Sequence, residues 1–459
     1  MKKIYQKYKP FYIESLLLAL PVVFSQVGHT LVQTVDSIIV GHFSGTISLA
    51  AVSLVNSIFV LGLVIGLGIS YGITPLIAQF NGRKDHAECG RLLSNALLIN
   101  GITGILLFLL ISIGTMQLID HLDQAPEVVR QAKPYLFLMG ISLAPLMIFN
   151  TFKQFAEGLG FTFQAMVISI VGNVVNVILG IIFVKGLFGI KPMGVAGVGW
   201  STLIDRFSMA VVMAFYVFRS KNFKEYLKSF ALKNIDRLRC LSILKIGAPV
   251  AMQYVFEISA FSGAAILIGT ISPVAQAAHQ IAINLAALTY MAASGISAAS
   301  AIKSGNYLGA KQHRDLRLSA ISNYHIVIVF MSVCALLFAF GNHLLPWMYT
   351  SDEAVISIAS QLLIIAALFQ LFDGTQVVGL GILRGMGDVN VPTLFTMIAY
   401  WVVGLPVGYL LGIQLKMGVT GVWYGLVMGL LSSSLLLFFR FQYISRRHQV
   451  KQDYIIARD

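Results

Sequence analysis

The chain has 459 residues, of which 57% are hydrophobic and only 11% are charged, and its formal net charge is +13. A soluble domain carries roughly 25% charged residues, so this composition excludes an ordinary water-soluble enzyme. The three cysteines, Cys89, Cys240 and Cys334, are odd in number and far apart in the sequence, which argues against a disulfide framework or a CxxC metal site.

The apolar residues occur in runs that are long enough to cross a bilayer as helices. About 20 apolar residues span the hydrocarbon core, where a helix satisfies its own backbone hydrogen bonds. The sequence predicts twelve such helices, at 13–40, 48–79, 92–117, 134–154, 163–184, 193–218, 242–270, 277–303, 317–341, 355–382, 392–414 and 418–441. The first run is too long for a signal-peptide core and lacks a small-residue cleavage site, so we expect no removable signal.

The basic residues between these helices divide unequally between the two sides of the membrane. One side receives those of both termini and of the segments 83–91, 219–245 and 311–317, together with Arg384 in the loop after 382, whereas the other receives only Arg130, Lys133, Lys185, Lys191 and Lys416. Because cytoplasmic loops are rich in Lys and Arg, we expect both termini in the cytoplasm. This bias explains the basic charge without nucleic acid, and the basic patches are also candidates for holding anionic lipid.

The sequence also contains an internal repeat. Pro21, Gly41 and Asn56 recur 228 positions later as Pro249, Gly269 and Asn284, and segments 82–88, 157–160 and 193–198 recur at offsets of 224 to 227. We therefore predict two six-helix lobes, 1–220 and 241–459, joined by a basic cytoplasmic linker at 221–240. Because six is even, the lobes share one orientation and are related by a pseudo-two-fold axis along the membrane normal. Transporters with such repeats commonly hold substrate between the lobes.

Small residues and prolines predict how the helices pack and bend. Glycines four residues apart allow close helix packing, and they are Gly62/Gly66, Gly68/Gly72 and Gly404/Gly408/Gly412. Prolines inside helices are expected to bend them, and they are Pro21, Pro145, Pro249 and Pro406.

Two acidic residues lie deep inside predicted helices of the second lobe. Glu257 is near the middle of 242–270 and Asp373 near the middle of 355–382, and neither has a basic residue close to it in the sequence. An ionisable group in hydrocarbon costs at least about 2.5 kcal/mol, so such groups usually face a cavity or a partner. A carboxylate in this setting takes a proton or binds a cation, which is what a coupling site needs. The alternative is a protonated acid that bonds between helices for packing.

Two further acids lie in the first lobe. Asp36 is near the outer end of 13–40 on a polar helix face, and it is a candidate for the same site or a structural helix-end acid. Asp205 is followed directly by Arg206, and adjacent helical residues do not face each other. We interpret Asp205 and Arg206 as a local packing pair with neighbouring helices.

Other polar side chains in these helices are candidates for completing a site. They are Tyr290, Asn173, Asn176, Gln280 and Asn284. A tyrosine ring that faces a cavity can hold an organic cation through its quadrupole. Each of them is alternatively an interhelical hydrogen bond, and we interpret His279 as a core histidine.

Enzyme signatures are missing from the sequence. We find no Walker-type loop, no nucleophile elbow and no metal-spaced cluster, so we expect neither an enzyme nor a cofactor. Because no ATP-binding loop is present, the energy for transport must come from an ion gradient, which supplies about 2.3 kcal/mol per charge at 100 mV. A channel is a second alternative, but channels usually gain symmetry by oligomerising, whereas two internal lobes already enclose a path. We therefore expect a functional monomer.

Five stretches together resemble the multidrug and toxic compound extrusion (MATE) family, in its NorM-like bacterial branch. They are Val-Asp-Ser-Ile-Ile-Val-Gly at 35–41, Phe-Glu-Ile-Ser at 256–259, Ala-Ala-His-Gln-Ile-Ala-Ile-Asn at 277–284, Leu-Gly-Ile-Leu-Arg-Gly at 380–385 and Tyr-Trp-Val-Val-Gly-Leu-Pro-Val-Gly-Tyr at 400–409. The resemblance covers nearly the whole chain. It implies multidrug efflux of cationic, amphipathic compounds from the bacterial cytoplasmic membrane in exchange for Na⁺ or H⁺.

The resemblance also implies site residues. The three membrane acids of the family match Asp36, Glu257 and Asp373, and Glu257 and Asp373 would bind the coupling ion, including Na⁺. Tyr290 falls where related proteins have a tyrosine near that site. Phe369, one turn before Asp373, stands where some relatives have a tyrosine, so that oxygen is missing and the choice between Na⁺ and H⁺ stays open.

The nearest rival is a flippase for lipid-linked saccharides, which shares the general architecture. It predicts cationic residues inside the cavity to hold pyrophosphate. Apart from Arg206 we expect none in the transmembrane runs, which favours cationic cargo.

Overall fold

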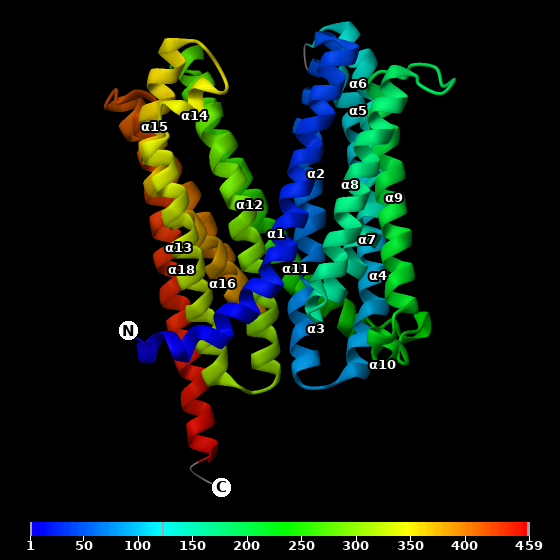
Figure 1. Ribbon diagram of the computed structural model, residues 1–459, viewed down its shortest axis with the longest axis vertical. Helices are drawn as coiled ribbons and strands as arrows, with labels where there is room; N and C mark the ends of the chain where they lie inside the picture. Colours follow the sequence, from blue (N-terminus) through cyan, green and yellow to red (C-terminus); the bar gives the residue numbers. More distant parts are fainter. Residues whose placement is uncertain (1, 122–123, 457–459) are drawn as a thin grey trace. The chain divides into compact units, whose positions relative to one another are not determined.

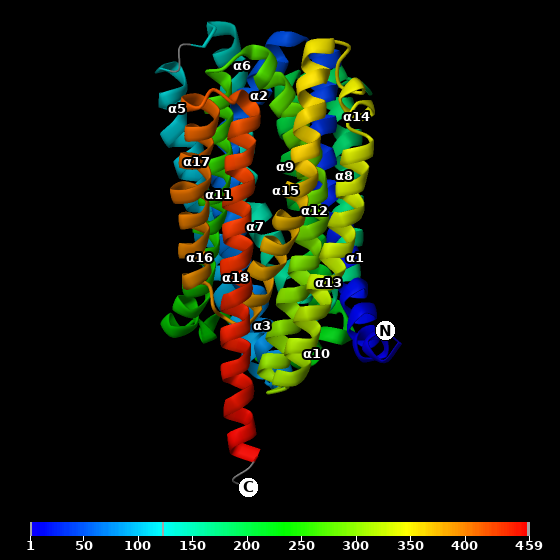
Figure 2. The same ribbon diagram turned by 90° about the vertical axis from the view of Figure 1, so that its left-hand side faces the viewer.

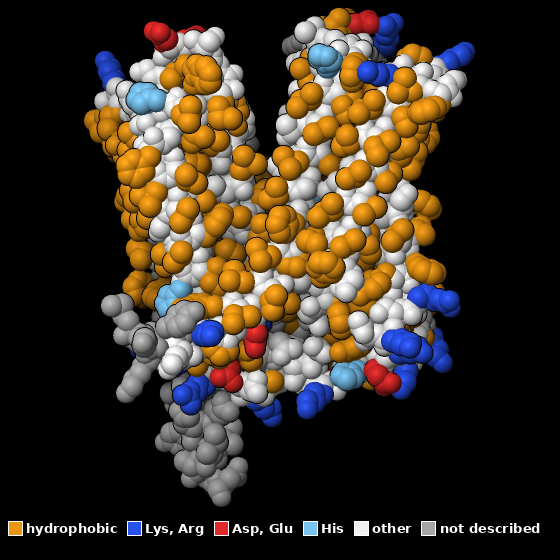
Figure 3. All heavy atoms as spheres, in the orientation of Figure 1, with side chains coloured by type: hydrophobic (Ala, Val, Ile, Leu, Met, Phe, Trp, Pro, Cys, Tyr) orange, Lys and Arg blue, Asp and Glu red, His pale blue; other side chains and the backbone are white. Residues whose placement is uncertain are grey.

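The computed structural model describes residues 2–121 and 124–456, and the secondary structure of this part is helical throughout. Twelve helical spans in it are long and apolar enough to cross a membrane, which confirms the all-α membrane fold. They are Gln6–Ser44, Thr46–Gly82, His86–His121, Pro126–Gly158, Thr162–Lys185, Val195–Arg219, Arg237–Gly269, Pro273–Gly309, His313–Phe340, Glu353–Gly385, Asn390–Gln414 and Gly418–Arg447. Each span overlaps one predicted helix. Figure 3 shows hydrophobic side chains along the helices and charged ones gathered at their ends.

The chain forms two compact units. The N-terminal unit is Phe24–Ala251, and the C-terminal unit is Met1–Val23 together with Met252–Asp459. These units differ from the predicted division at 220 and 241, because the first half of α1 (Lys2–Ser44) belongs to the C-terminal unit and the start of α11 (Arg237–Gly269) to the N-terminal unit. An ion pair between Glu14 and Lys303 is one of the contacts that hold the start of α1 in its unit.

In the N-terminal unit the central helix is α7 (Leu143–Gly158), which packs against α3, α4 and α9. Figure 1 labels these helices together with the others of the unit. The remaining elements are α2 (Thr46–Ser70), α3 (Ile73–Gly82), α4 (His86–Phe108), the π-helix η1 (Leu109–Gly114), α5 (Thr115–Leu118), η2 (Ile119–His121), α6 (Pro126–Ile141), α8 (Thr162–Lys185) and α9 (Val195–Arg219).

In the C-terminal unit the central helix is α15 (Glu353–Gly385), which packs against α12, α13 and α18. Figure 2 shows α16 and α17, which follow each other in one span, beside α18. The remaining elements are α12 (Pro273–Gly309), α13 (His313–Phe340), α14 (Leu344–Trp347), α16 (Asn390–Met397), the π-helix η5 (Ile398–Gly404), α17 (Leu405–Tyr409), the π-helix η6 (Leu410–Gln414) and α18 (Gly418–Ile456).

The repeat is visible in the burial of the two central helices. Every residue from Phe149 to Gly158 of α7 is buried, and so is every residue from Gln376 to Gly385 of α15. These two stretches lie 227 positions apart, the offset of the loop repeat that follows them. A helix that is buried all round carries its polar side chains into the interior of its unit.

The predicted linker is folded rather than extended. It contains η3 (Lys221–Phe223), α10 (Lys224–Leu227) and η4 (Leu232–Asn234), and it packs on α4. The Tyr226 hydroxyl donates to Asn81 Oδ1 at 2.8 Å, and Asn95 Nδ2 donates to the Asn234 carbonyl at 3.1 Å. The linker therefore belongs to the N-terminal unit.

The glycines and prolines act as predicted in several places. A Cβ on Gly68 would collide with the backbone of Ala251, and one on Gly425 with the backbone of Gly408, so these helices approach closely only because the residues are glycines. Pro406 lies between the two π-helices of span eleven, where its missing N–H removes one α-helical bond.

Candidate functional site

The two deep acids of the C-terminal unit lie within electrostatic reach of each other, beside a tyrosine. Glu257 on α11 is 7% exposed and Asp373 on α15 is 2% exposed. The Tyr400 hydroxyl, on η5, donates to Glu257 Oε1 at 3.5 Å and accepts from Gln376 Nε2 at 2.7 Å. Gln376 lies one turn after Asp373 on the same helix. Asp373 interacts electrostatically with Glu257 and Tyr400, and we term Glu257, Asp373, Tyr400 and Gln376 the acid cluster.

Tyr290 on α12 belongs to the acid cluster as well. Its hydroxyl interacts electrostatically with Glu257 and Asp373, and also with Tyr254 and Tyr400. Three phenols thus surround two carboxylates. Carboxylate oxygens bind hard cations, and phenol rings attract organic ones, so this arrangement can serve either kind of ligand.

The sequence reasoning missed Arg384 at this cluster. Arg384 is buried near the end of α15, and it interacts electrostatically with Glu257 and hydrogen-bonds the Tyr254 side chain. The predicted helix stopped at 382, which left Arg384 in a loop, whereas α15 continues to Gly385. Glu257 has no basic neighbour along the sequence, but the fold brings Arg384 within electrostatic reach of it.

The other predicted residues of this unit lie in different surroundings. Phe369 packs its ring against Phe261 and Trp423, with centroids 6.1 and 5.6 Å away. Gln280 and Asn284 bond each other at 3.0 Å on an exposed face of α12.

His279 is a buried core histidine, as predicted. Its Nδ1 accepts from Trp423 Nε1 at 3.2 Å.

A second group of polar side chains lines a pocket inside the N-terminal unit. The cavity has a volume of about 120 Å³. Three predicted residues line it, Asp36, Asn173 and Asn176. The other polar residues of the lining are Gln26, His29, Gln33, Asn56, Tyr71, Tyr135, Asn150, Lys153, Thr202, Asp205 and Arg206. The lining comes from α1, α2, α6, α7, α8 and α9, and from Tyr71, which follows α2.

The carboxylates of this pocket have unsatisfied oxygens. Asp36 Oδ1 and Asp205 Oδ1 are buried and accept no hydrogen bond from the described residues. Asn176 Nδ2 donates to Thr202 Oγ1 at 3.3 Å beside them. Buried polar atoms normally have a partner, so these oxygens are available to a bound cation or water.

Asp205 and Arg206 are more than the packing pair that we predicted. Both line the pocket. Arg206 Nη1 donates to Ser142 Oγ at 2.6 Å, and its guanidinium lies 5.1 Å from the Phe59 ring centroid. These neighbours fix the arginine while its charge remains in the pocket.

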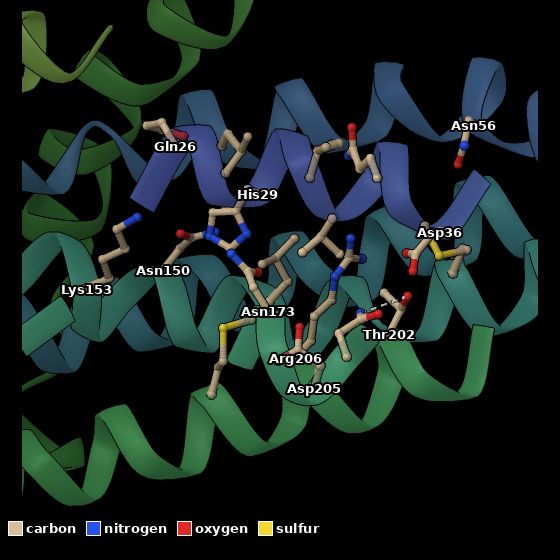
Figure 4. Close-up of a pocket in the computed structure, with 18 of the residues that line it drawn as sticks. Gln26, His29, Asp36, Asn56, Asn150, Lys153, Asn173, Thr202, Asp205 and Arg206 are labelled. Atoms are coloured by element: carbon tan, nitrogen blue, oxygen red, sulfur yellow. Dashed lines mark hydrogen bonds between the residues drawn. The ribbon is translucent and has the colours of Figure 1, made fainter. Parts of the chain in front are cut away.

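The pocket is also lined by Lys153 and His29, which sequence reasoning missed. Lys153 Nζ donates to Ser25 Oγ at 3.0 Å and lies 3.9 Å from Glu157 Oε1. The side chains of Lys153 and Glu157 are 5% and 4% exposed. The expectation that Arg206 is the only cation within the membrane runs is therefore wrong. Figure 4 shows Lys153 at one end of the pocket, Asp36 near the other and Arg206 between them.

The repeat relates the pocket to the acid cluster. At the 228-residue offset His29 corresponds to Glu257, and at the 227-residue offset Glu157 corresponds to Arg384. In each of these two pairs of equivalent positions, one unit has an acidic residue and the other unit has a basic one.

Comparison with known proteins gives the family. The MatE family model matches residues 21–182 and again residues 249–410. The Probable multidrug resistance protein NorM of Idiomarina loihiensis is 32% identical, and the Multidrug resistance protein NorM of Photobacterium profundum is 33% identical; each alignment covers 94% of both chains. The Multidrug resistance protein MdtK of Edwardsiella ictaluri is 30% identical over 94% of this chain and 95% of its own.

Solved structures share the fold. A MATE protein in the bent conformation aligns with a TM-score of 0.88 at 18% identity, over 97% of this chain and 98% of that one. A Pyrococcus furiosus transporter of the MOP superfamily, described as having a binding pocket of reverse polarity, aligns with a TM-score of 0.84 at 19% identity, over 96% and 97%. Because the family model matches both halves and the relatives match nearly end to end, the chain belongs to the MatE family of multidrug and toxic compound extrusion proteins.

Proposed function

We propose that this protein exports amphipathic organic cations across the bacterial cytoplasmic membrane in exchange for Na⁺ or H⁺. The observation that carries the proposal is the acid cluster. Glu257 and Asp373 are buried in membrane-spanning helices and interact electrostatically with each other, and Tyr400 hydrogen-bonds Glu257. Acids at membrane depth mark ion pathways by default, because their burial is costly without a ligand or a proton.

The relatives support the efflux part of the proposal. Proteins named multidrug resistance protein NorM align over 94% of this chain at 32 to 33% identity. Export of several unrelated compounds needs an adaptable site, and phenol rings around carboxylates provide one that recognises charge without a fixed shape.

The coupling follows from sharing one negative site. A ligand shifts a conformational equilibrium only by as much as its affinity differs between the two states. Na⁺ or H⁺ entering from outside occupies the acid cluster and weakens the hold on an organic cation, which leaves. Once the ion is released inside, the carboxylates are free to take the next organic cation. The ion is cargo, and the proposal needs no resident cofactor.

The choice between Na⁺ and H⁺ depends on how many oxygens surround the ion. The side chain of Phe369 has no oxygen to contribute, and its ring packs against Phe261 and Trp423. Proteoliposome efflux of ethidium, driven separately by a Na⁺ gradient and by a pH gradient, distinguishes the two ions. Asp36 in the pocket of the N-terminal unit is a further candidate cation ligand, since its Oδ1 has no partner among the described residues.

The decisive test removes one carboxylate at a time. We expect Glu257→Gln and Asp373→Asn to lose efflux driven by the gradient, while Glu353→Gln retains it. Glu353 is a matched control, because it is exposed at the start of the same helix as Asp373. Wild-type efflux from either cluster variant would contradict the proposal.

A flippase for lipid-linked saccharides remains the second candidate, and one observation favours it. Lys153 and Arg206 line the pocket of the N-terminal unit, where they could attract a pyrophosphate. Asp36 and Asp205 line the same pocket and balance their charge, which makes it dipolar rather than cationic. Scrambling of a fluorescent pyrophosphate lipid in the same proteoliposomes, without ethidium efflux, would select the flippase.

The proposal includes a monomer with both termini in the cytoplasm. Reporter fusions at the C-terminus test the orientation, since alkaline phosphatase is active only outside and a fluorescent protein only inside. Size-exclusion chromatography with light scattering tests the monomer.

A further inference from the structure

A basic cavity lies within the C-terminal unit, between the start of α1 and the start of α13. It has a volume of about 230 Å³ and is lined by Lys7, Tyr8, Arg314, Arg317, Leu318 and Ile321. We propose that this cavity binds the phosphate of an anionic phospholipid headgroup. The site lies apart from the acid cluster, and the inference does not depend on the transported compound.

Among the residues whose side chains the structure describes, the lining has three positive charges and no acidic residue. Arg317 is held in place by α18, because its Nη2 donates to Gln442 Oε1 at 2.7 Å. Asp315, the neighbour of Arg314, interacts electrostatically with Tyr307 and is not part of the lining. A fixed arginine with two further cations beside it suits a phosphate, which accepts several charge-assisted hydrogen bonds.

The wall formed by α1 is anchored on α13. The Tyr8 ring meets the His325 ring edge-on at 5.3 Å, and the Tyr12 hydroxyl and His325 Nδ1 are 2.8 Å apart. The two helices that line the cavity therefore contact each other directly, although Lys7 and Arg314 are exposed.

The depth of the cavity favours a lipid. Lys7 and Arg314 each lie one residue after the start of a candidate membrane span, Gln6–Ser44 and His313–Phe340, and the ends of membrane-spanning helices lie near the lipid headgroups. Leu318 and Ile321, one and two turns into the same span, provide an apolar wall that an acyl chain can follow. Basic residues at this level contribute roughly 1 kcal/mol each to binding of anionic lipid.

The repeat allows the cavity to be compared with the equivalent face of the N-terminal unit. At the 227-residue offset Arg314 and Arg317 correspond to Ala87 and Gly90 on α4. There the linker fills the equivalent space, since a Cβ on Gly90 would meet the Tyr226 carbonyl. The charges of that face are also neutralised, because Glu88 pairs with Arg239 at 2.5 Å and with Arg91 at 3.2 Å. In the C-terminal unit the equivalent face has cations beside an open space, and a bound anion would fill this space and neutralise them.

The test measures apparent lipid affinity of the purified full-length protein, from its melting temperature in detergent at increasing lipid concentration. The probes are phosphatidylglycerol, zwitterionic phosphatidylcholine and inorganic phosphate. We expect Arg314→Gln and Arg317→Gln each to weaken the phosphatidylglycerol affinity about fivefold, which corresponds to one lost cation. Lys9→Gln is the matched control, because Lys9 is exposed on α1 and does not line the cavity.

Two results would overturn the proposal. One is an unchanged phosphatidylglycerol affinity in the double variant Arg314→Gln/Arg317→Gln. The other is equal stabilisation by inorganic phosphate, which would assign the site to a soluble anion. Should the arginine variants fail to fold, Lys7→Gln removes a cation from an exposed position of the lining, and the same fivefold loss is expected.

Discussion

At position 29 the N-terminal unit has a histidine, and 228 residues later the C-terminal unit has Glu257. Both side chains lie on the first long helix of their repeat, and both face a buried polar group of residues. The surrounding charges differ. In the pocket, Asp36 and Asp205 are accompanied by Arg206 and Lys153, whereas the acid cluster has two carboxylates and one arginine.

If the proposed function holds, this difference predicts that the two units have different roles in transport. A group with more carboxylates than cations gains from binding a positive ligand, and is the better place for ion coupling. A balanced pocket gains less from a simple cation, but it can orient a ligand that carries both signs of charge. The following variants test whether the two units differ in this way.

The largest effect is expected from breaking the buried pair of α7. Lys153→Met leaves Glu157 without its cation and should destabilise the protein by roughly 3 to 5 kcal/mol, as for other buried pairs that lose one member. The double variant Lys153→Met/Glu157→Gln should recover most of this loss, because it leaves no buried charge. Melting temperatures in detergent measure both. Equal melting of the single variant and the wild type would show that the pair contributes no stability.

The next largest effect is expected at one of the two repeat-related positions, Glu257 rather than His29. Glu257→Gln should lower ion-driven ethidium efflux at least about tenfold, the equivalent of about 1.4 kcal/mol, because the acid cluster loses half of its carboxylates. His29→Gln should retain most of the activity, since it removes no negative charge. Initial rates in proteoliposomes provide the measurement. A larger loss in His29→Gln than in Glu257→Gln would move the coupling site to the N-terminal unit.

The sequence was sufficient to predict the spans and to single out the two buried acids of the C-terminal unit. Uninterrupted apolar runs locate membrane helices, and a lone carboxylate within such a run stands out. Glu257 and Asp373 were found in this way. Their partner Tyr400 was not, because nothing in a sequence of aromatic and aliphatic residues singles out one phenol 143 positions away.

The pocket could be predicted only in part, for a physical reason. α7 is buried on all sides, so no periodic pattern distinguishes the face that carries Lys153 from the others. Lys153 finds its acceptor on Ser25, 128 positions away, and Arg206 finds Ser142, 64 positions away. Such partners are set by how the helices pack together, which local sequence does not encode. The unit boundaries at Val23 and Ala251 depend on packing in the same way.

A smaller effect tests the charge balance of the pocket. Asp36→Asn leaves one carboxylate against Arg206 and Lys153, so the affinity for a monovalent organic cation should fall roughly fivefold, about 1 kcal/mol. A related compound that also carries a carboxylate should lose less. Competition binding with both compounds measures the ratio, and Glu127→Gln is the control, because Glu127 is an exposed acid of the same unit. Equal losses for the two compounds would contradict a dipolar pocket.

The smallest effect is expected from Tyr400→Phe, which keeps the ring and removes the hydroxyl between Gln376 and Glu257. The bond to Glu257 is long, at 3.5 Å, so its loss should weaken the apparent ion affinity only about threefold. Tyr324→Phe is the control, because the Tyr324 hydroxyl is buried in the same unit with no hydrogen-bond partner among the described residues. Ethidium efflux measured against ion concentration separates ion affinity from maximal rate. A purely structural tyrosine would lower the maximal rate and leave the ion dependence unchanged, whereas a tyrosine that positions Glu257 for the ion shifts the ion dependence first.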